Sequence, residues 1–263
     1  MTCYAVALNR RQLIYLRDLL RELVARDLKL RYKRSIMGMA WSLLVPLAQL
    51  LVLYIVFYHM LPLNIPNYTT FLFTGILPWT WFQSSLISAS GAIVDNRELV
   101  RQVGFPVGVL PAITVISHLV HFLIALPILS VFLLLDGYRP GSAILALPLV
   151  ILIQFILTLS LAYIVATFQV TFRDTQYLLG VLLFLFFYLT PVFYDDTFIP
   201  AGARQLYILN PMVHLLGAYR SILIRGELPA GLPLLMLCVF SAVLLLLGYS
   251  VFVRARNYFV EEV

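Results

Sequence analysis

Long apolar stretches separated by short polar connections dominate the chain after residue 40. A helix needs about 20 mostly apolar residues to cross the hydrocarbon core of a bilayer. The pattern therefore predicts an all-α integral membrane protein with six transmembrane helices. The six stretches cover residues 40–61, 70–94, 107–135, 142–170, 176–194 and 232–253.

Two further segments have a different pattern. In residues 10–34, leucines at positions 13, 16, 20 and 23 recur at helical spacing, while charged residues occupy the other face. This predicts an amphipathic helix, which either packs on its own protein or lies in the membrane interface next to the first span. Residues 195–231 are semi-polar but rich in Leu, Ile and Tyr. They are too apolar for a free loop, so we expect short re-entrant helices before the last span.

The chain therefore divides into two parts: a cytoplasmic arm with an amphipathic interface helix, residues 1–39, and a six-span transmembrane domain, residues 40–263. Hydrophobic residues make up 62% of the sequence and charged residues only 11%. Soluble domains carry about a quarter charged residues. The composition therefore excludes a soluble enzyme.

The basic residues are unevenly placed. Nine of the 18 Lys and Arg precede residue 35, directly before the first apolar stretch. Basic segments next to a span set topology or contact anionic lipid, so we expect membrane lipid as a partner and no nucleic acid. With the N-terminus inside, fourteen Lys and Arg lie inside and four outside. This predicts that both termini are cytoplasmic.

No catalytic or metal-binding pattern is present in the sequence. Neither G-x-x-x-x-G-K-[ST], G-x-S-x-G nor H-E-x-x-H occurs. His118 and His121 share a helix face, but two histidines without a nearby carboxylate make a poor metal site, so helix-to-helix hydrogen bonding is the main alternative to a ligand or proton role. Asp195 and Asp196 are the only acidic pair at a span end. They are either a polar cap or the acid of a membrane acyl- or glycosyltransferase.

Aromatic side chains recur at helical spacing in two stretches. Each trio is either a lipid-facing or packed stripe, or the lining of a passage. Rings with few charges suit a weakly charged carbohydrate, whose sugar rings have apolar faces and hydroxyl rims. The candidate channel-lining residues are Tyr54, Phe57, Tyr58, Phe184, Phe187 and Tyr188.

Two polar turns lie on the predicted cytoplasmic side. Residues 95–106 (DNRELVRQVGFP) predict a short helix with Asp95 as its cap, and residues 171–176 (TFRDTQ) form the second turn. Both are ordinary connectors, or they are surfaces on which another protein acts.

Four segments, in unbroken order, resemble the type 2 ABC exporter permeases that move O-antigen, teichoic acid and related polysaccharides. The first two are RDLKLRYKRSIMGMAWSLLVPL (26–47) and GILPWTWFQSSLISASGAIVDNRELVRQVGFP (75–106). The others are FRDTQYLLGVLLFLFFYLTPVFY (172–194) and LNPMVHLLGAYRSILIRGELP (209–229). A permease for a small lipid or drug, and the membrane transferase, remain as alternatives.

The resemblance implies a homodimer in the bacterial inner membrane, bound to two copies of a separate ATPase. The dimer would export an undecaprenyl-linked polysaccharide. ATP and Mg would bind the partner subunit, with no cofactor on this chain. The implied ATPase-coupling residues are Arg26, Asp27, Arg31, Tyr32, Asp95, Asn96, Arg97, Glu98, Arg101, Arg173 and Asp174, and the implied outer-gate residues are Pro191, Tyr194, Asn210, Pro211 and Tyr219.

Overall fold

The computed structural model describes residues 10–32, 37–60, 63–138, 141–200, 202 and 204–262, and helices are its only regular elements over these ranges. The helices are α1 (Arg10–Tyr32), α2 (Trp41–Tyr54), α3 (Tyr68–Gly91), α4 (Arg97–Val100), α5 (Val109–Leu135), α6 (Leu147–Thr171), α7 (Thr175–Leu189), α8 (Arg204–Ile208), α9 (Pro211–Arg220) and α10 (Gly231–Glu262). Short 3₁₀ or π turns flank several of them: η1 (Gly38–Ala40), η2 (Ile55–Met60), η3 (Val94–Asn96), η4 (Ser142–Ala146), η5 (Asp196–Phe198) and η7 (Ser221–Arg225).

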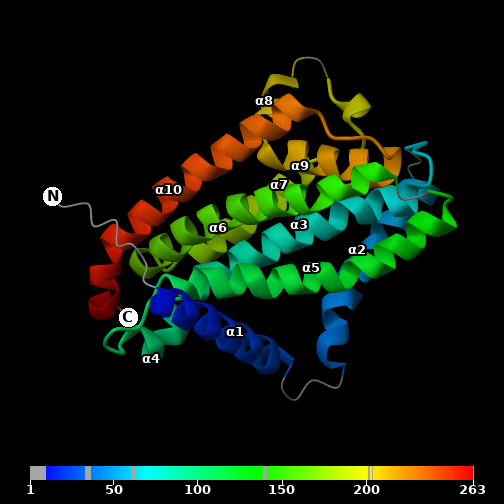
Figure 1. Ribbon diagram of the computed structural model, residues 1–263. Helices are drawn as coiled ribbons and strands as arrows, with labels where there is room; N and C mark the ends of the chain where they lie inside the picture. Colours follow the sequence, from blue (N-terminus) through cyan, green and yellow to red (C-terminus); the bar gives the residue numbers. More distant parts are fainter. Residues whose placement is uncertain are drawn as a thin grey trace.

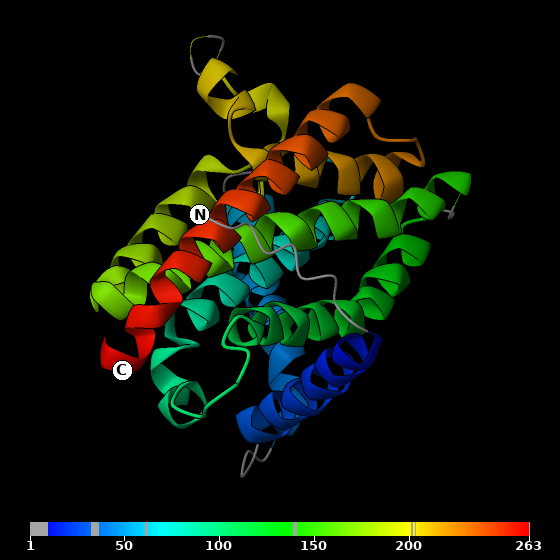
Figure 2. The same cartoon turned by 60° about the vertical axis from the view of Figure 1, so that its left-hand side comes forward.

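Helix α3 is the central helix of the bundle. It packs against α2, α5, α6, α7 and α9, and α10 covers the far side of α6 (Figure 1). The start of α1, α4 and the end of α10 gather at one end, which we call the α4 end. The opposite end, with α8, the turn after α5 and the turns on either side of α9, is called the α8 end (Figure 2).

Four helical segments are long and apolar enough to cross a bilayer, which establishes the integral membrane class. They are Trp41–Met60, Val109–Leu135, Ser142–Thr171 and Gly231–Arg256, and Thr175–Leu189 is a shorter apolar helix. The six predicted spans therefore match four such helices in the described part of the chain. The second and fifth predicted spans differ from the expectation, each for its own reason.

The second predicted span, helix α3, is long enough but too polar. Thr70, Thr74, Ser85 and Ser90 are fully buried inside the bundle. The hydroxyls of Thr74 and Ser90 donate to backbone carbonyls one turn earlier, at 2.8 and 2.7 Å. Because α3 is surrounded by protein rather than lipid, it tolerates polar side chains that a lipid-facing helix excludes.

The fifth predicted span, helix α7, ends five residues before the expected position. Thr190 has an extended backbone and Pro191 follows it, so the helix stops at Leu189. Its 15 residues rise about 22 Å at 1.5 Å per residue, which is shorter than a hydrocarbon core of about 30 Å. The chain continues as a non-helical segment, residues 190–194, that packs against the first turns of α3.

Helix α1 has the predicted amphipathic pattern. Leu16, Leu20 and Leu23 pack against an apolar cluster at the α4 end that is separate from the main core around α3. We call it the second apolar cluster, and it includes Ile93 and Phe252. The charged residues on the opposite face are exposed, and Arg17 pairs with Asp18 at 2.9 Å. Since α1 packs along α5, its apolar face is partly covered by its own protein.

Candidate functional site

The α4 end presents a charged surface built from three places in the sequence. Arg26 and Asp27 of α1 and Asn96 line one small cavity, so α1 and the α4 region meet there. Asp27 and Asn96 are half-buried. The exposed candidates are Arg26, Asp95, Arg97, Glu98, Arg101, Arg173 and Asp174. The side chains of Arg31 and Tyr32 lie outside the described residues.

The predicted cap at Asp95 is wrong. Neither η3 nor α4 has a side-chain cap hydrogen bond, and Ile93 and Asn96 occupy the two cap positions. The Asp95 carboxylate lies against Gly91 instead, where a Cβ would come within 2.5 Å of it. Helix α4 is also shorter than expected: it ends at Val100, and the chain turns through Gly104 at a φ of +83°.

The two predicted aromatic trios lie on α2 with η2 and on α7, and both α2 and α7 pack against α3. Tyr54 stacks on Tyr58 at 4.8 Å, and Phe184 meets Tyr188 edge-on at 5.3 Å. Phe184 is 59% exposed and Tyr188 is 51% exposed. Phe187 is different because its ring is buried against Trp79 of α3, at 5.7 Å.

Phe193 connects the trios, although the sequence did not single it out. Its ring stacks on Phe57 at 4.9 Å and lies 5.7 Å from Phe187 and 6.0 Å from Tyr188. Phe193 belongs to segment 190–194, directly after α7. The sequence signal for it was Pro191, which marks where the helix ends. The aromatic side chains after it therefore do not follow the helical spacing of α7.

Two of the predicted gate residues, Pro191 and Tyr194, belong to segment 190–194, and a third, Asn210, bonds to it. Asn210 caps α9, where its side-chain oxygen accepts from the Met212 amide at 2.9 Å, and Pro211 occupies the first turn. The Asn210 amide also donates to the Thr190 hydroxyl at 2.9 Å. Pro191 is buried, and Tyr194 donates to the Tyr188 carbonyl at 3.2 Å.

Tyr219 and Arg220, at the end of α9, both point into the protein. Tyr219 is fully buried and lies 6.1 Å from the ring of Phe122. Arg220 is 7% exposed, and Nη2 donates to the Val192 carbonyl at 2.9 Å. In the sequence, Arg220 is only one of the four basic residues on the predicted outer side. A single arginine gives no signal of burial in a sequence.

Asp195 and Asp196 are both engaged at the α8 end. Asp195 caps η5 by accepting from the Thr197 amide at 3.1 Å, and Asp196 accepts from the Tyr207 hydroxyl. Burial, with the bond to Asp196 next, raises the pKa of Tyr207 above its ordinary value. The Tyr207 phenol therefore stays protonated and acts as a hydrogen-bond donor.

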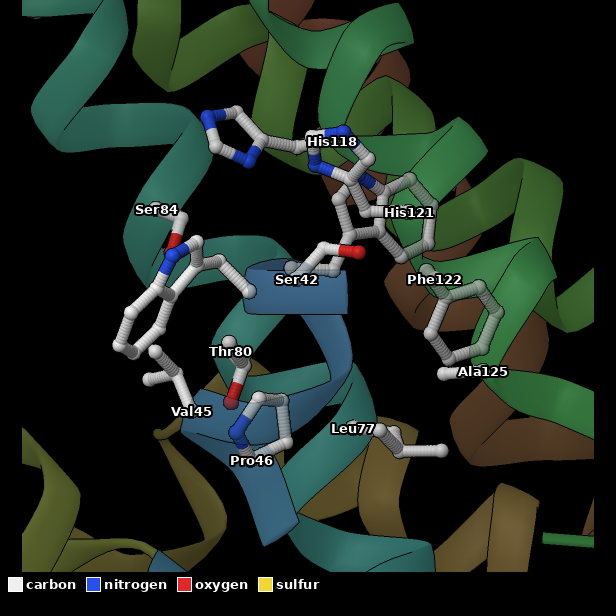
Figure 3. A pocket seen from close by; sticks show the side chains of 12 residues that line it. Ser42, Val45, Pro46, Leu77, Thr80, Ser84, His118, His121, Phe122 and Ala125 are labelled. Carbon is white, nitrogen blue, oxygen red and sulfur yellow. The ribbon is translucent and has the colours of Figure 1, made fainter. Parts of the chain in front are cut away.

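A cavity of about 350 Å³ lies between α2, α3 and α5 (Figure 3). Ser42 of α2, Ser84 of α3, and His118 and His121 of α5 line it. His118 Nε2 lies 3.0 Å from the Ser88 hydroxyl. His118 therefore links α5 to α3 by a hydrogen bond, in agreement with the helix-to-helix alternative predicted from the sequence. The described residues around this cavity include no Asp, Glu, Lys or Arg, and no group of three metal-ligating side chains occurs in the described chain.

Comparison with known proteins gives one consistent family. Residues 18–224 match the family described as ABC-2 type transporter. The chain is 40% identical to the O-antigen export system permease protein RfbA of Myxococcus xanthus, over 96% of this chain and 98% of that one. It is 32% identical to the protein of the same name from Klebsiella pneumoniae (94% and 95% covered). It is 25% identical to the polysialic acid transport protein KpsM of Escherichia coli (89% and 92% covered).

Proposed function

Because this chain belongs to the ABC-2 type transporter family, we propose that it is the channel-forming permease that exports a lipid-linked polysaccharide such as O-antigen. Permeases of this family work with a separate ATPase. The observation that carries the substrate class is the near full-length similarity to the Myxococcus xanthus O-antigen export permease. The exposed aromatic side chains of η2 and α7, which include Tyr58, Phe184 and Tyr188, also support a carbohydrate substrate.

The proposed topology is six crossings of the bacterial inner membrane, with both termini in the cytoplasm. Helix α3 has 24 residues and is about 36 Å long, which suffices for a crossing inside a protein sheath. Helix α7 would cross with the help of segment 190–194. The α4 end is then cytoplasmic and the α8 end faces outward, as the bias of basic residues favours.

We further propose that α2 and α7 form the face where two copies meet and enclose the passage. Both helices flank the buried α3 and leave large apolar side chains exposed. Large exposed apolar faces on a helix bundle need either lipid or a partner. In this arrangement Tyr54, Phe57, Tyr58, Phe184 and Tyr188 line the passage. Phe187 supports them from within the core, since its ring packs on Trp79.

The charged surface at the α4 end is the proposed contact with the ATPase, of which two copies would bind the permease dimer. Its exposed arginines and carboxylates lie on rigid elements, because α1 and α4 both pack on the second apolar cluster. Movement of the ATPase can therefore reach α5 and α10 without first deforming a loop. ATP and Mg belong to that partner, and this chain would hold no cofactor of its own.

The competing functions receive less support. A membrane transferase would need a free acid, but Asp195 caps a turn and Asp196 bonds to Tyr207. A permease for small lipids or drugs fits the family as well. The polysaccharide names of all three compared relatives favour a carbohydrate polymer. The outer gate in this proposal consists of segment 190–194 with Asn210, Pro211 and Tyr219.

Co-purification tests the proposal. The chain would be expressed with the ATPase encoded beside it, extracted in detergent, and analysed for mass and ATP hydrolysis. The proposal predicts a stable complex of two permeases and two ATPases that hydrolyses ATP and restores polysaccharide export in a deletion strain. A permease that purifies alone and leaves export unchanged on deletion would contradict it.

The coupling surface has its own test. Arg97→Glu reverses an exposed charge on α4 and leaves the core untouched, so it should lower transport-linked ATP hydrolysis severalfold without changing the melting temperature. Arg204→Glu, an exposed residue on α8 at the opposite end, is the matched control and should leave hydrolysis unchanged. Equal activity of both variants and the parent protein would move the ATPase contact elsewhere.

A further inference from the structure

Arg220 is the one Asp, Glu, Lys or Arg side chain that is buried among the residues the structure describes. Its guanidinium carbon lies 3.7 Å from the centre of the Phe71 ring, and Nη2 donates to the Val192 carbonyl at 2.9 Å. Within the described chain, its Nε has no hydrogen-bond partner and no carboxylate forms an ion pair with it. Asp195 and Asp196 attract this charge only from beyond ion-pair distance, so its close partners are the Phe71 ring and the Val192 carbonyl.

The carbonyl that Arg220 binds belongs to segment 190–194. Backbone groups outside a helix need partners from elsewhere when they are buried. Side chains supply them here: Arg220 binds the Val192 carbonyl, and the Tyr68 hydroxyl binds the Phe193 carbonyl at 2.9 Å. Asn210 holds the Thr190 hydroxyl. Donors from α3 and α9 thus fix three of the five residues in the segment.

Gly75 of α3 makes this arrangement possible. A Cβ at position 75 would lie 2.6 Å from the Val192 oxygen and 3.0 Å from Nη2 of Arg220. Only a residue without a side chain lets the segment and the guanidinium approach the helix so closely. Three parts of the chain that are distant in sequence therefore meet around one arginine.

Fixing Val192 also fixes the residue after it. Phe193 carries the ring that stacks on Phe57 of η2 and contacts Phe187 and Tyr188. This ring joins the two aromatic trios at the α8 end of the α2–α7 face. Its position determines whether the trios are bridged at that end.

We propose that Arg220 is a positioning residue that holds segment 190–194 against α3 and so keeps Phe193 bridged to Phe57. The cation–π contact with Phe71 sets the plane of the guanidinium, which aims Nη2 at the Val192 carbonyl. Loss of the arginine frees the segment and separates Phe193 from Phe57. The idea that this bridge closes the outer end of a passage rests on the proposed function. The role of Arg220 in positioning the segment does not.

Cross-linking between positions 57 and 193 tests the proposal. Phe57→Cys and Phe193→Cys are introduced after Cys3 and Cys238 are replaced by serine, and the pair is linked with a short bismaleimide in membranes. Arg220→Gln should lower the intramolecular yield at least fivefold. Arg225→Gln is the matched control, because Arg225 donates to Ser221 within its own turn and should leave the yield unchanged.

Arg220→Lys covers the case in which the glutamine variant fails to fold. Lysine keeps the charge but has no planar group to lie on Phe71 and aim at Val192, so the yield should still fall at least twofold. A yield equal to the parent in whichever of these variants folds would overturn the proposal, even if export were lost. The yield does not depend on the exported substrate. If Arg220→Gln lowers the yield but the parent protein itself exports no polysaccharide, only the proposed function is refuted.

Discussion

Helices α3 and α7 are both rich in aromatic side chains, but their surroundings are opposite. In α3, Trp79 is fully buried, and Phe73 and Trp81 are nearly so. In α7, Phe184 and Tyr188 are more than half exposed. The two helices even touch, because Phe187 of α7 packs on Trp79. Aromatic content alone therefore does not reveal what a helix does in this molecule.

The polar residues of α3 explain the difference. A helix with buried threonines and serines must lie inside protein, whereas α7 carries almost only apolar side chains. In a membrane protein the most apolar helices face outward, toward lipid or another subunit, and the mixed helix forms the centre. The aromatic side chains of α3 build the core, and those of α7 are available for contacts beyond the chain.

Trp79→Ala is the largest expected disruption of this comparison. Removing a fully buried indole leaves a cavity beside Phe82, Phe186 and Phe187, and such truncations cost about 3–5 kcal/mol. We expect a much lower melting temperature for the purified protein. Phe184→Ala on α7 is the control and should change stability by about 0.5 kcal/mol or less. Equal destabilisation by both would remove the distinction between core and surface helix.

A pair of glycines gives the next largest effect, with opposite signs. Gly75→Ala in α3 forces a methyl group against the Val192 carbonyl and should cost about 1–3 kcal/mol. Gly180→Ala in α7 meets open space and should stabilise the helix by about 0.5–1 kcal/mol. The melting temperatures of the two variants, compared with the parent protein, test whether the two effects have opposite signs. A stabilised Gly75→Ala protein would show that segment 190–194 is not held against α3.

The smallest effect on stability comes from the exposed rings. Tyr58→Ala should change the free energy of unfolding by about 0.5 kcal/mol or less, because the ring is exposed. It should still reduce polysaccharide export, because the ring faces the proposed passage. Phe240→Ala, an exposed aromatic on α10 away from that face, is the matched variant. Export assayed in cells should separate the two. Identical export by both would indicate that exposed rings contact lipid alone.

Periodicity predicted the helices well where the local sequence decides the outcome. The amphipathic helix at residues 10–34 and the long apolar helices follow from spacing and composition, which are local properties. The end of α7 was missed by five residues, although Thr190 and Pro191 carried the signal. Asp95 was wrongly expected to cap a helix, because the turn through η3 places its carboxylate beside Gly91 instead.

The contacts that join distant segments were beyond prediction from one sequence. Arg220 and Val192 are 28 residues apart, and Phe57 and Phe193 are 136 apart, so no periodicity relates them. Phe187 was grouped with two exposed neighbours, yet its own ring is buried. Which side of α7 faces α3 is decided by packing, and helical spacing gives the faces without telling which one is inside.

Disulfide cross-linking can show whether α7 faces a second copy of the chain, as proposed. A single cysteine at position 184 of α7, in a protein without Cys3 and Cys238, would be oxidised in native membranes. The same experiment at position 247 of α10, which is equally exposed, is the control. We expect a covalent dimer from position 184 and none from position 247. A dimer from position 247 alone would contradict this expectation.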